Sequence, residues 1–181
     1  MPKILVLFHS RTGNTAAVAD AIAEGARSVR FAEVDVRRID DLVPESTSDA
    51  DPAWKAGRDA LAARYHTLRD VEELAGYDGL VLGSPSRDGV MSAELAHLLD
   101  RAGPLQQQGA FVNTVGSAFT PEATGHRGQE TTLWSIMTSM MNLGLILVPP
   151  SATDLATAQD QGKRVAEVVG WMTHARSHHH H

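Results

Sequence analysis

The sequence predicts a doubly wound α/β domain, in which helices cover both faces of a parallel sheet. Short apolar segments recur along the chain, and segments with helical spacing of apolar residues separate them. A loop rich in Ser and Thr directly follows the first apolar segment. Strands that alternate with helices are joined by crossover connections, so they lie parallel in one sheet.

Five segments have the pattern of strands. Residues 4–8 and 79–84 are continuous apolar runs, as in strands buried on both faces. Residues 31–36 present alternating kinds of side chain to the two faces, and further strands are expected at 110–115 and 144–148. Five strands in a chain of this length predict the flavodoxin-like order 2-1-3-4-5, whose ligand lies beyond the carboxyl ends of the strands.

The same periodicity argument predicts helices at 15–27, 92–102, 129–142 and 157–172. The stretch 40–68 is polar at first and then rich in Ala and Arg, so we expect an insertion with one helix at the edge of the domain. Residues 1–174 then form a single domain. Residues 177–181 are interpreted as the remnant of a purification tag, and their four histidines carry no argument about metal.

Composition excludes several classes of protein. The chain has 181 residues, a formal net charge of −6 and no cysteine. Disulfides, thiolate nucleophiles and cysteine metal sites are therefore excluded, and a reducing, cytoplasmic location is expected. A mildly acidic chain is a poor binder of nucleic acid. We also expect no membrane span and no metal site, because no apolar run reaches roughly 20 residues and the other histidines lack metal-ligand spacing.

Residues 10–15, with the sequence Ser-Arg-Thr-Gly-Asn-Thr, predict a phosphate site at the start of the first helix. The hydroxyls can bond a phosphate, Gly13 permits a turn that most residues resist, and amides at a helix start attract an anion. The patterns GxxxxGK[ST] and GxGxxG are both absent. The alternative interpretation is an ordinary Ser/Thr cap with a turn glycine.

Two more loops are expected at the same edge of the sheet. Residues 83–92 follow the third strand, and residues 115–119 lead from the fourth strand into a polar loop that ends at 126–132. Three loops that converge in this way suit a flat cofactor. Arg87 is placed to face a carbonyl of such a cofactor or a negative substrate; the alternative is a solvated loop charge.

Three motifs in this order resemble those of a known family. The loop S-x-T-G-N-T resembles that of flavodoxins, and GSPSRDGVMS and HRGQETTL resemble segments of the WrbA-type NAD(P)H:quinone oxidoreductases. The segment DPAWKAG is also similar to a stretch found in some of these enzymes. The resemblance runs from the first strand to Pro149 and again through the last helix.

The resemblance implies an enzyme that holds FMN without a covalent bond. It would take a hydride from NADH or NADPH and pass two electrons to a quinone, and it would form a homodimer or homotetramer. His126 and Arg87 are the implied catalytic residues, which would stabilise the reduced flavin or the quinone oxygen; the alternative for His126 is a loop histidine bonded to backbone. The implied cofactor-binding residues are Ser10, Arg11, Thr12, Gly13, Asn14, Thr15, Pro85, Ser86, Arg87, Thr114, Val115, Gly116, Ser117 and Ala118.

The chain departs from the family pattern at four places. Asp88 stands where the family usually has Phe, Arg127 replaces the first Gly of a pair, and Leu143 replaces an aromatic residue or His. Residues 151–160 are also too few to hold the long segment that usually precedes the last helix. Three alternatives therefore stay open: a flavodoxin-type electron carrier, an FMN-dependent reductase of azo, nitro or free flavin substrates, and a non-catalytic regulator or scaffold.

Overall fold

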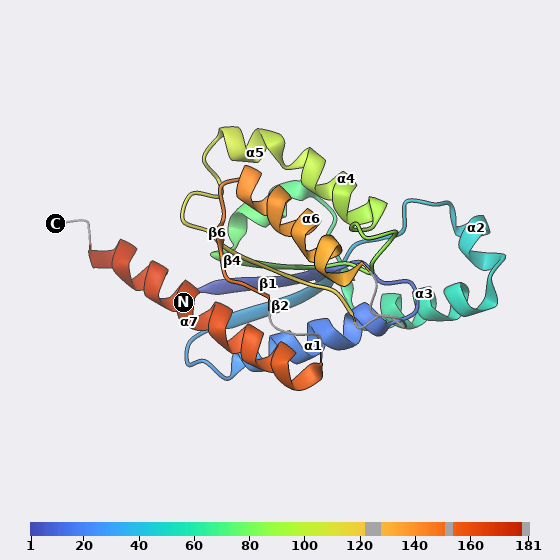
Figure 1. The fold of residues 1–181 in the computed structure, drawn as a ribbon, viewed down its shortest axis with the longest axis horizontal. Helices are drawn as coiled ribbons and strands as arrows, with labels where there is room; N and C mark the ends of the chain where they lie inside the picture. Colours follow the sequence, from blue (N-terminus) through green and yellow to red (C-terminus); the bar gives the residue numbers. More distant parts are fainter. Residues whose placement is uncertain (122–127, 151–153, 179–181) are drawn as a thin grey trace.

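The computed structural model describes residues 1–121, 128–150 and 154–178. The described residues form three layers, with a parallel sheet between two layers of helices (Figure 1). The sheet has six strands in the order β3-β2-β1-β4-β5-β6. The strands are β1 (Lys3–Phe8), β2 (Glu33–Arg38), β3 (His66–Thr67), β4 (Gly79–Gly83), β5 (Val115–Phe119) and β6 (Ile146–Leu147).

The predicted α/β class is confirmed, but the prediction of five strands in the order 2-1-3-4-5 is wrong in one respect. A sixth strand, β3, pairs in parallel with β2 at the edge of the sheet. Strand β3 has only two residues, which is too short to produce a hydrophobic period that a sequence can reveal. The other five strands lie in the expected spatial order.

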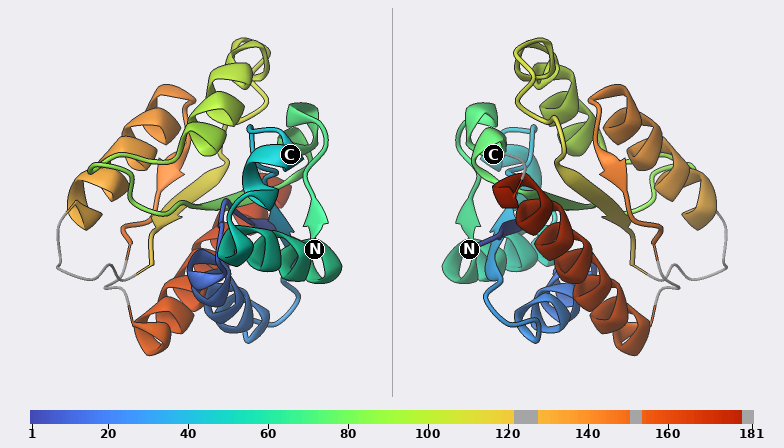
Figure 2. Two further views of the ribbon diagram at one scale, coloured as in Figure 1. Left: turned by 90° about the vertical axis from the view of Figure 1, so that its right-hand side faces the viewer. Right: turned by 90° about the vertical axis from the view of Figure 1, so that its left-hand side faces the viewer.

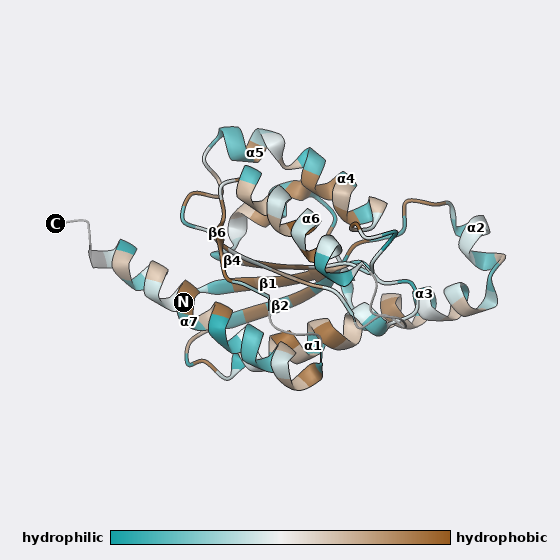
Figure 3. Ribbon diagram, viewed as in Figure 1, coloured by the Kyte–Doolittle hydropathy of each residue, from teal (hydrophilic) through white to brown (hydrophobic). Residues whose placement is uncertain are grey.

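The two faces of the sheet carry different helices, as Figure 1 shows. Helices α1 (Asn14–Arg27) and α7 (Leu155–His178) cover one face, and α4 (Ala93–Arg101), α5 (Gly103–Gln107) and α6 (Gln129–Asn142) cover the other. Alternate residues of β1 point to opposite faces, so Ile4, Val6 and Phe8 join one apolar cluster while Leu5 and Leu7 join the second. Figure 3 shows the hydrophobic strands between the helices.

The region predicted as an insertion with one helix contains two, α2 (Glu45–Asp49) and α3 (Pro52–Arg64). The carboxylate of Asp51 accepts hydrogen bonds from the amides of Ala53 and Trp54, and Pro52 opens the helix, so the start of α3 is fixed locally. At its other end the ring of Tyr65 packs edge-on against Phe8, with ring centres 5.1 Å apart. The insertion lies at the carboxyl end of the strands, the end that the left view of Figure 2 faces.

Strand β5 lies four to five residues further along the chain than predicted. The expected strand 110–115 is instead a series of turns, because Gly109 and Asn113 adopt positive φ values of 74° and 65°. Phe111 is buried while Val112 is 67% exposed. Only Phe111 of these two apolar residues therefore packs in the core, and the segment does not form a strand. Strand β2 is likewise shifted, by two residues. A 3-10 helix, η1 (Val71–Gly76), precedes β4.

None of the helices formed by the described residues is long and apolar enough to cross a lipid bilayer. The longest, α7, packs along α1 and is amphipathic: Val165, Ala166 and Val169 are fully buried while Lys163 and Trp171 are exposed. The helix continues through Ser177 to His178, the first residues of the segment interpreted as a tag remnant.

Candidate functional site

The loop after β1 has the features of an anion site. The amide of Gly13 donates to Oγ of Ser10 at 3.0 Å, and the φ of 106° at Gly13 turns the chain into α1. In the described residues no side chain caps the amino end of α1, and its first turn holds no carboxylate. The first amides of α1 therefore lack a side-chain acceptor, and the helix dipole favours an anion at this point.

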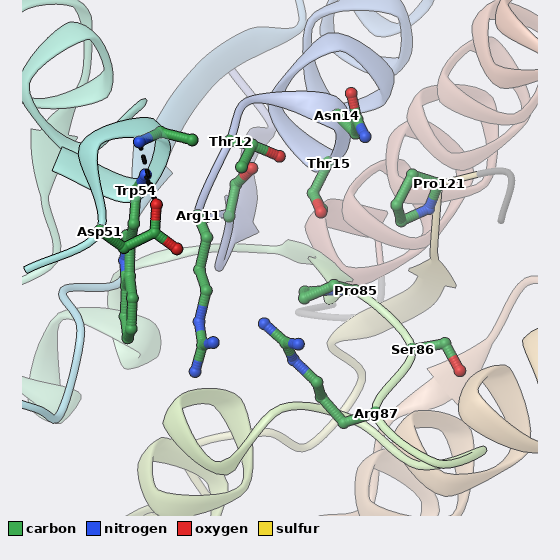
Figure 4. A pocket seen from close by; sticks show the side chains of 12 residues that line it. Arg11, Thr12, Asn14, Thr15, Asp51, Trp54, Pro85, Ser86, Arg87 and Pro121 are labelled. Atoms are coloured by element: carbon green, nitrogen blue, oxygen red, sulfur yellow. Dashed lines mark hydrogen bonds between the residues drawn. The ribbon is translucent and has the colours of Figure 1, made fainter. Parts of the chain in front are cut away.

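The strands that precede the three loops end at one level of the sheet. Phe8 pairs with Gly83, and Gly83 pairs with Phe119, so β1, β4 and β5 deliver their loops to the same edge. There the loops and the insertion surround a cavity of about 500 Å³ (Figure 4). Its lining comprises Ser10, Arg11, Thr12, Asn14, Thr15, Asp51, Ala53, Trp54, Pro85, Ser86, Arg87 and Pro121.

A tight hairpin positions Arg87. The amide of Arg87 donates to the carbonyl of Val90 at 2.8 Å, and the amide of Val90 donates back at 3.0 Å. The two residues between them, Asp88 and Gly89, have φ values of 51° and 80°. Asp-Gly is a preferred pair for a two-residue turn with positive φ at both positions, which explains Asp88 where the resembled family has Phe. The loop is a defined hairpin, and Arg87 lies at its base.

Ser86 joins this loop to the start of α6. Its hydroxyl donates to the carbonyl of Gly128 at 3.2 Å, and Oγ1 of the fully buried Thr132 lies 2.8 Å from Ser86 Oγ. The side-chain amide of Gln129 donates to the carbonyl of Pro121 at 3.1 Å, which ties α6 to the end of β5 as well. The walls of the cavity near Pro85 and Pro121 are therefore held by α6.

Thr120 presents an unpaired hydroxyl at the carboxyl end of β5. The residue is 1% exposed, and its Oγ1 has no hydrogen-bond partner among the described residues. It directly precedes Pro121, which lines the cavity. Since a buried hydroxyl without a partner is unfavourable, this group is suited to bond a ligand.

The opposite wall of the cavity is a chain of polar contacts that ends at a buried histidine. The guanidinium of Arg11 lies 3.9 Å from the ring centre of Trp54, whose Nε1 donates to Asp41 at 2.9 Å. The other oxygen of Asp41 lies 2.9 Å from Nε2 of the fully buried His9. Nδ1 of His9 lies 3.6 Å from the carboxylate of Glu94, on α4. His9, Asp41 and Glu94 thus form a cluster with ligand atoms within 4.8 Å of one another, in which His9 and Glu94 are buried and Asp41 is partly exposed. The spacing of histidines in the sequence does not reveal it.

Most predicted site residues meet in the cavity. Ser10, Arg11, Thr12, Asn14, Thr15, Pro85, Ser86 and Arg87 line it, and Gly13 lies in the same loop. The expected loop residues Thr114 to Ala118 do not reach it: Val115 pairs with Gly79 at the amino end of the sheet, and Ser117 bonds the carbonyl of Val148 inside the core. The shifted position of β5 is the reason. His126 lies outside the described residues.

Five residues in or beside the cavity lining were not selected from the sequence. Asp51, Ala53 and Trp54 belong to the insertion, where an Asp-Pro pair signals a helix start. Thr120 and Pro121 follow the true end of β5, so a correct strand boundary is the signal that would have identified them.

The donors present fit a flavin mononucleotide. The amides at the start of α1 and the hydroxyls of Thr12 and Thr15 suit its phosphate, as Figure 4 shows for the side chains. The cavity of about 500 Å³ lies in the range of cofactor sites. The buried, unpaired hydroxyl of Thr120 lies one residue before Pro121 of this lining.

A parallel sheet with an uncapped helix start and loops that converge at the carboxyl edge defines a nucleotide-binding protein of the flavodoxin-like class. The sequence profile of the NADPH-dependent FMN reductase family matches residues 2–160, so the chain belongs to this family. The resemblance predicted from the three motifs is thereby confirmed.

Relatives and solved structures agree with this assignment. An NAD(P)H dehydrogenase (quinone) of Rhodopseudomonas palustris is 36% identical over 202 aligned positions, which cover 93% of this chain and 98% of the relative. One from a Bradyrhizobium species is 43% identical over 148 residues, 82% of this chain and 70% of the relative. The fold is similar to that of a WrbA-like flavodoxin from Agrobacterium tumefaciens, with a TM-score of 0.68 at 22% identity over 95% of this chain and 99% of that one.

The first of these alignments is longer than the chain itself, at 202 positions against 181 residues. The relative therefore has residues with no counterpart here.

Proposed function

We propose that the protein is an FMN-dependent oxidoreductase that transfers two electrons from NADH or NADPH to a quinone. The observation that carries the proposal is the uncapped start of α1, which opens into the cavity shared by the loops after β1, β4 and β5. The family assignment and the name of the relatives, NAD(P)H dehydrogenase (quinone), support the same activity. Bound FMN would supply the redox chemistry, as hydride acceptor and then as electron donor.

Each wall of the cavity has a separate role in this proposal. The amides of residues 14 and 15 and the hydroxyls of Thr12 and Thr15 hold the phosphate. Pro85, Ser86 and Pro121 form the walls for the ring, and α6 keeps them rigid through Gln129 and Thr132. In place of residues 114–118, we assign the ring contacts after β5 to residues 120 and 121.

Two catalytic assignments stay proposals. Arg87 carries a positive charge at the rim of the cavity, where it would stabilise developing negative charge on a quinone oxygen. His126, from its own or a neighbouring subunit, would act near the ring. Replacement of either by Gln is expected to lower the rate of quinone reduction about tenfold or more while FMN stays bound.

We also propose that the protein forms a homodimer or homotetramer. An exposed apolar groove of about 490 Å³ lies along α6 and the end of the sheet, between Trp134, Met137 and Pro149. Trp134 and Met141 are 61% and 49% exposed, and large apolar side chains grouped in this way mark a contact surface. A second copy of the chain is the partner that the family resemblance implies.

The visible absorption spectrum tests the central proposal. The purified protein is mixed with excess FMN, freed of unbound flavin and titrated with NADPH or NADH without oxygen, and a quinone is then added. Retained flavin bands that bleach with a nucleotide and return with the quinone are the expected result. Bands that never bleach would favour the electron carrier, and failure to retain flavin would contradict the assigned site.

A further inference from the structure

Two guanidinium groups converge in the cavity from different elements. Figure 4 shows the side chain of Arg11 pointing away from Thr12 and Asn14, and the side chain of Arg87 pointing toward it from the opposite loop. Both line the half of the cavity beside Trp54, across from Pro121. The resemblance assigns both arginines to FMN, but the amides at the start of α1 and the hydroxyls of the loop suffice for its one phosphate, so the two guanidinium groups are available to a second anion.

Neither cation is neutralised by the protein. No carboxylate of the described residues lies within 4.0 Å of the side-chain nitrogens of Arg11 or Arg87, and the buried Nε of Arg11 has no partner there. The one acid in the cavity lining, Asp51, uses Oδ1 to accept the amides of Ala53 and Trp54. Two converging positive charges repel each other, so an anion between them would be favourable.

Arg11 is also held in place. Its guanidinium stacks on the Trp54 ring at 3.9 Å, and the ring is fixed by the bond from Nε1 to Asp41. Asp41 in turn lies against the buried His9. A guanidinium fixed in this way loses little entropy when it binds, and its planar fork matches a phosphate.

We propose that Arg11 and Arg87 bind the 2′-phosphate of NADPH and so select NADPH over NADH, with Trp54 and Asp41 as positioning residues for Arg11. The inference rests on the proposed function. A phosphate monoester carries close to two negative charges at neutral pH, which matches two guanidinium groups, whereas each phosphate of the pyrophosphate carries one. Because the nucleotide leaves before the quinone enters, Arg87 can serve both ligands.

The first test measures binding without turnover. FMN-loaded protein is titrated by calorimetry with NADP+ and with NAD+, which differ only in the 2′-phosphate and cannot reduce the flavin. We expect NADP+ to bind about tenfold tighter or more, and Arg11→Gln to remove the difference. The matched control is Arg30→Gln, an exposed arginine that stacks on Phe31 outside the cavity lining and whose replacement leaves both affinities within twofold. Equal binding of the two probes to the unaltered protein would overturn the inference.

The second test follows anaerobic bleaching of the bound flavin at increasing NADPH or NADH. For Arg11→Gln, the concentration for half-maximal rate should rise about tenfold for NADPH and stay within twofold for NADH. If neither nucleotide bleaches the flavin, the proposed function is overturned. The calorimetric titration would still test whether Arg11 and Arg87 bind the 2′-phosphate. Bleaching with equal half-maximal concentrations for both nucleotides would overturn the subsite alone.

The positioning role has its own pair of variants. Trp54→Leu removes the ring that supports Arg11, and Trp54→Phe keeps an aromatic face there. The leucine variant should raise the half-maximal NADPH concentration severalfold with an unchanged limiting rate, and the phenylalanine variant should recover part of the affinity. NADPH affinities within twofold of the unaltered protein for both variants would contradict the role of Trp54.

Discussion

At residue 13 the backbone adopts a φ of 106°, and a Cβ added there would meet no atom within 4 Å. The cost of Gly13→Ala is therefore one of backbone strain, about 1–3 kcal/mol, and not of collision. We expect FMN to bind about tenfold weaker, because the strained loop turns its amides away from the phosphate. Quenching of FMN fluorescence on titration measures this affinity.

The control for this change is Gly76→Ala, where an added Cβ also meets nothing within 4 Å and the φ is not positive. That variant should bind FMN as the unaltered protein does. If Gly13→Ala also binds FMN normally, the loop after β1 does not hold the phosphate.

The hydroxyl of Thr120 allows a test that separates stability from binding. Because its Oγ1 is buried without a partner among the described residues, Thr120→Val should leave the free energy of unfolding of the flavin-free protein unchanged or raise it by up to about 1 kcal/mol. FMN affinity should fall severalfold if the hydroxyl bonds the cofactor. Urea unfolding and a flavin titration give the two quantities.

Thr132→Val is the matched comparison. This hydroxyl is fully buried and contacts both Ser86 and the carbonyl of Gly128, so its loss should lower the free energy of unfolding by about 1 kcal/mol or more. If Thr120→Val binds FMN with unaltered affinity, the Thr120 hydroxyl does not contact the cofactor.

Among the elements, α1 and α7 approach each other through two glycines. A Cβ added at Gly162 would lie 1.9 Å from the carbonyl oxygen of Ile22, and one at Gly25 would lie 1.8 Å from that of Gln159. Backbone atoms cannot move aside as a flexible side chain can. We expect Gly162→Ala to separate the helices and lower the free energy of unfolding by about 3 kcal/mol, measured by urea denaturation.

Gly170 provides the control on the same helix, since an added Cβ meets nothing there within 4 Å. Gly170→Ala should be neutral or stabilise the protein by up to about 1 kcal/mol through helix propensity. Similar unfolding midpoints for the two variants would show that the close contact between α1 and α7 is not maintained in solution.

The 3-10 helix η1 gives stability that depends on pH. The amide of Asp70 is the main group that lowers the pKa of Glu73 from its ordinary value of 4.5; the amide of Arg69 and the guanidinium of Arg37 add to this, against the effect of burial. A lowered pKa in the folded state means that stability is present above the unfolded pKa and is lost as the pH falls through the folded pKa.

Glu73→Gln should therefore cost about 1 kcal/mol of unfolding free energy at neutral pH, and the difference from the unaltered protein should shrink as the pH falls through the lowered pKa of Glu73. Urea unfolding at a series of pH values measures it. A difference that is constant with pH would show that the ionised carboxylate is not the source.

Whether a helix or strand could be predicted from the sequence depends on whether local signals or tertiary contacts determine its ends. The buried strands β1 and β4 and helix α6 were predictable because hydrophobic runs and periodicity are local signals. Strand β5 was not, since its three middle residues are small and the packing demands this: a Cβ at Gly116 would lie 2.6 Å from Met140. Its last residue, Phe119, packs over Gly83 of β4, where an added Cβ would collide with the ring. Tertiary contact, not strand propensity, places this element.

At the scale of the whole molecule, the phosphate loop was predictable because its sequence, position and chemistry coincide after β1. The wall of the insertion was not. Its contribution depends on Asp41, Trp54 and His9, which are far apart in sequence and meet only when α3 lies over the end of the sheet. The cavity is thus shared between the loops of the sheet and the inserted segment that contains α2 and α3.

Assembly is the last property that belongs to the whole molecule. If a second copy covers the groove on α6, a charge at its centre must be desolvated on association, which is unfavourable. Trp134→Glu should then convert the dimer or tetramer into a smaller species, measured by light scattering at working concentration, with the fold retained. The control is Trp171→Glu on α7: Trp171 is 59% exposed, close to the 61% of Trp134, but its ring stacks on Arg164 outside the groove. A monomeric mass for the unaltered protein would overturn the proposed oligomer. An equal loss of assembly in both variants would contradict the assignment of the interface to the groove on α6.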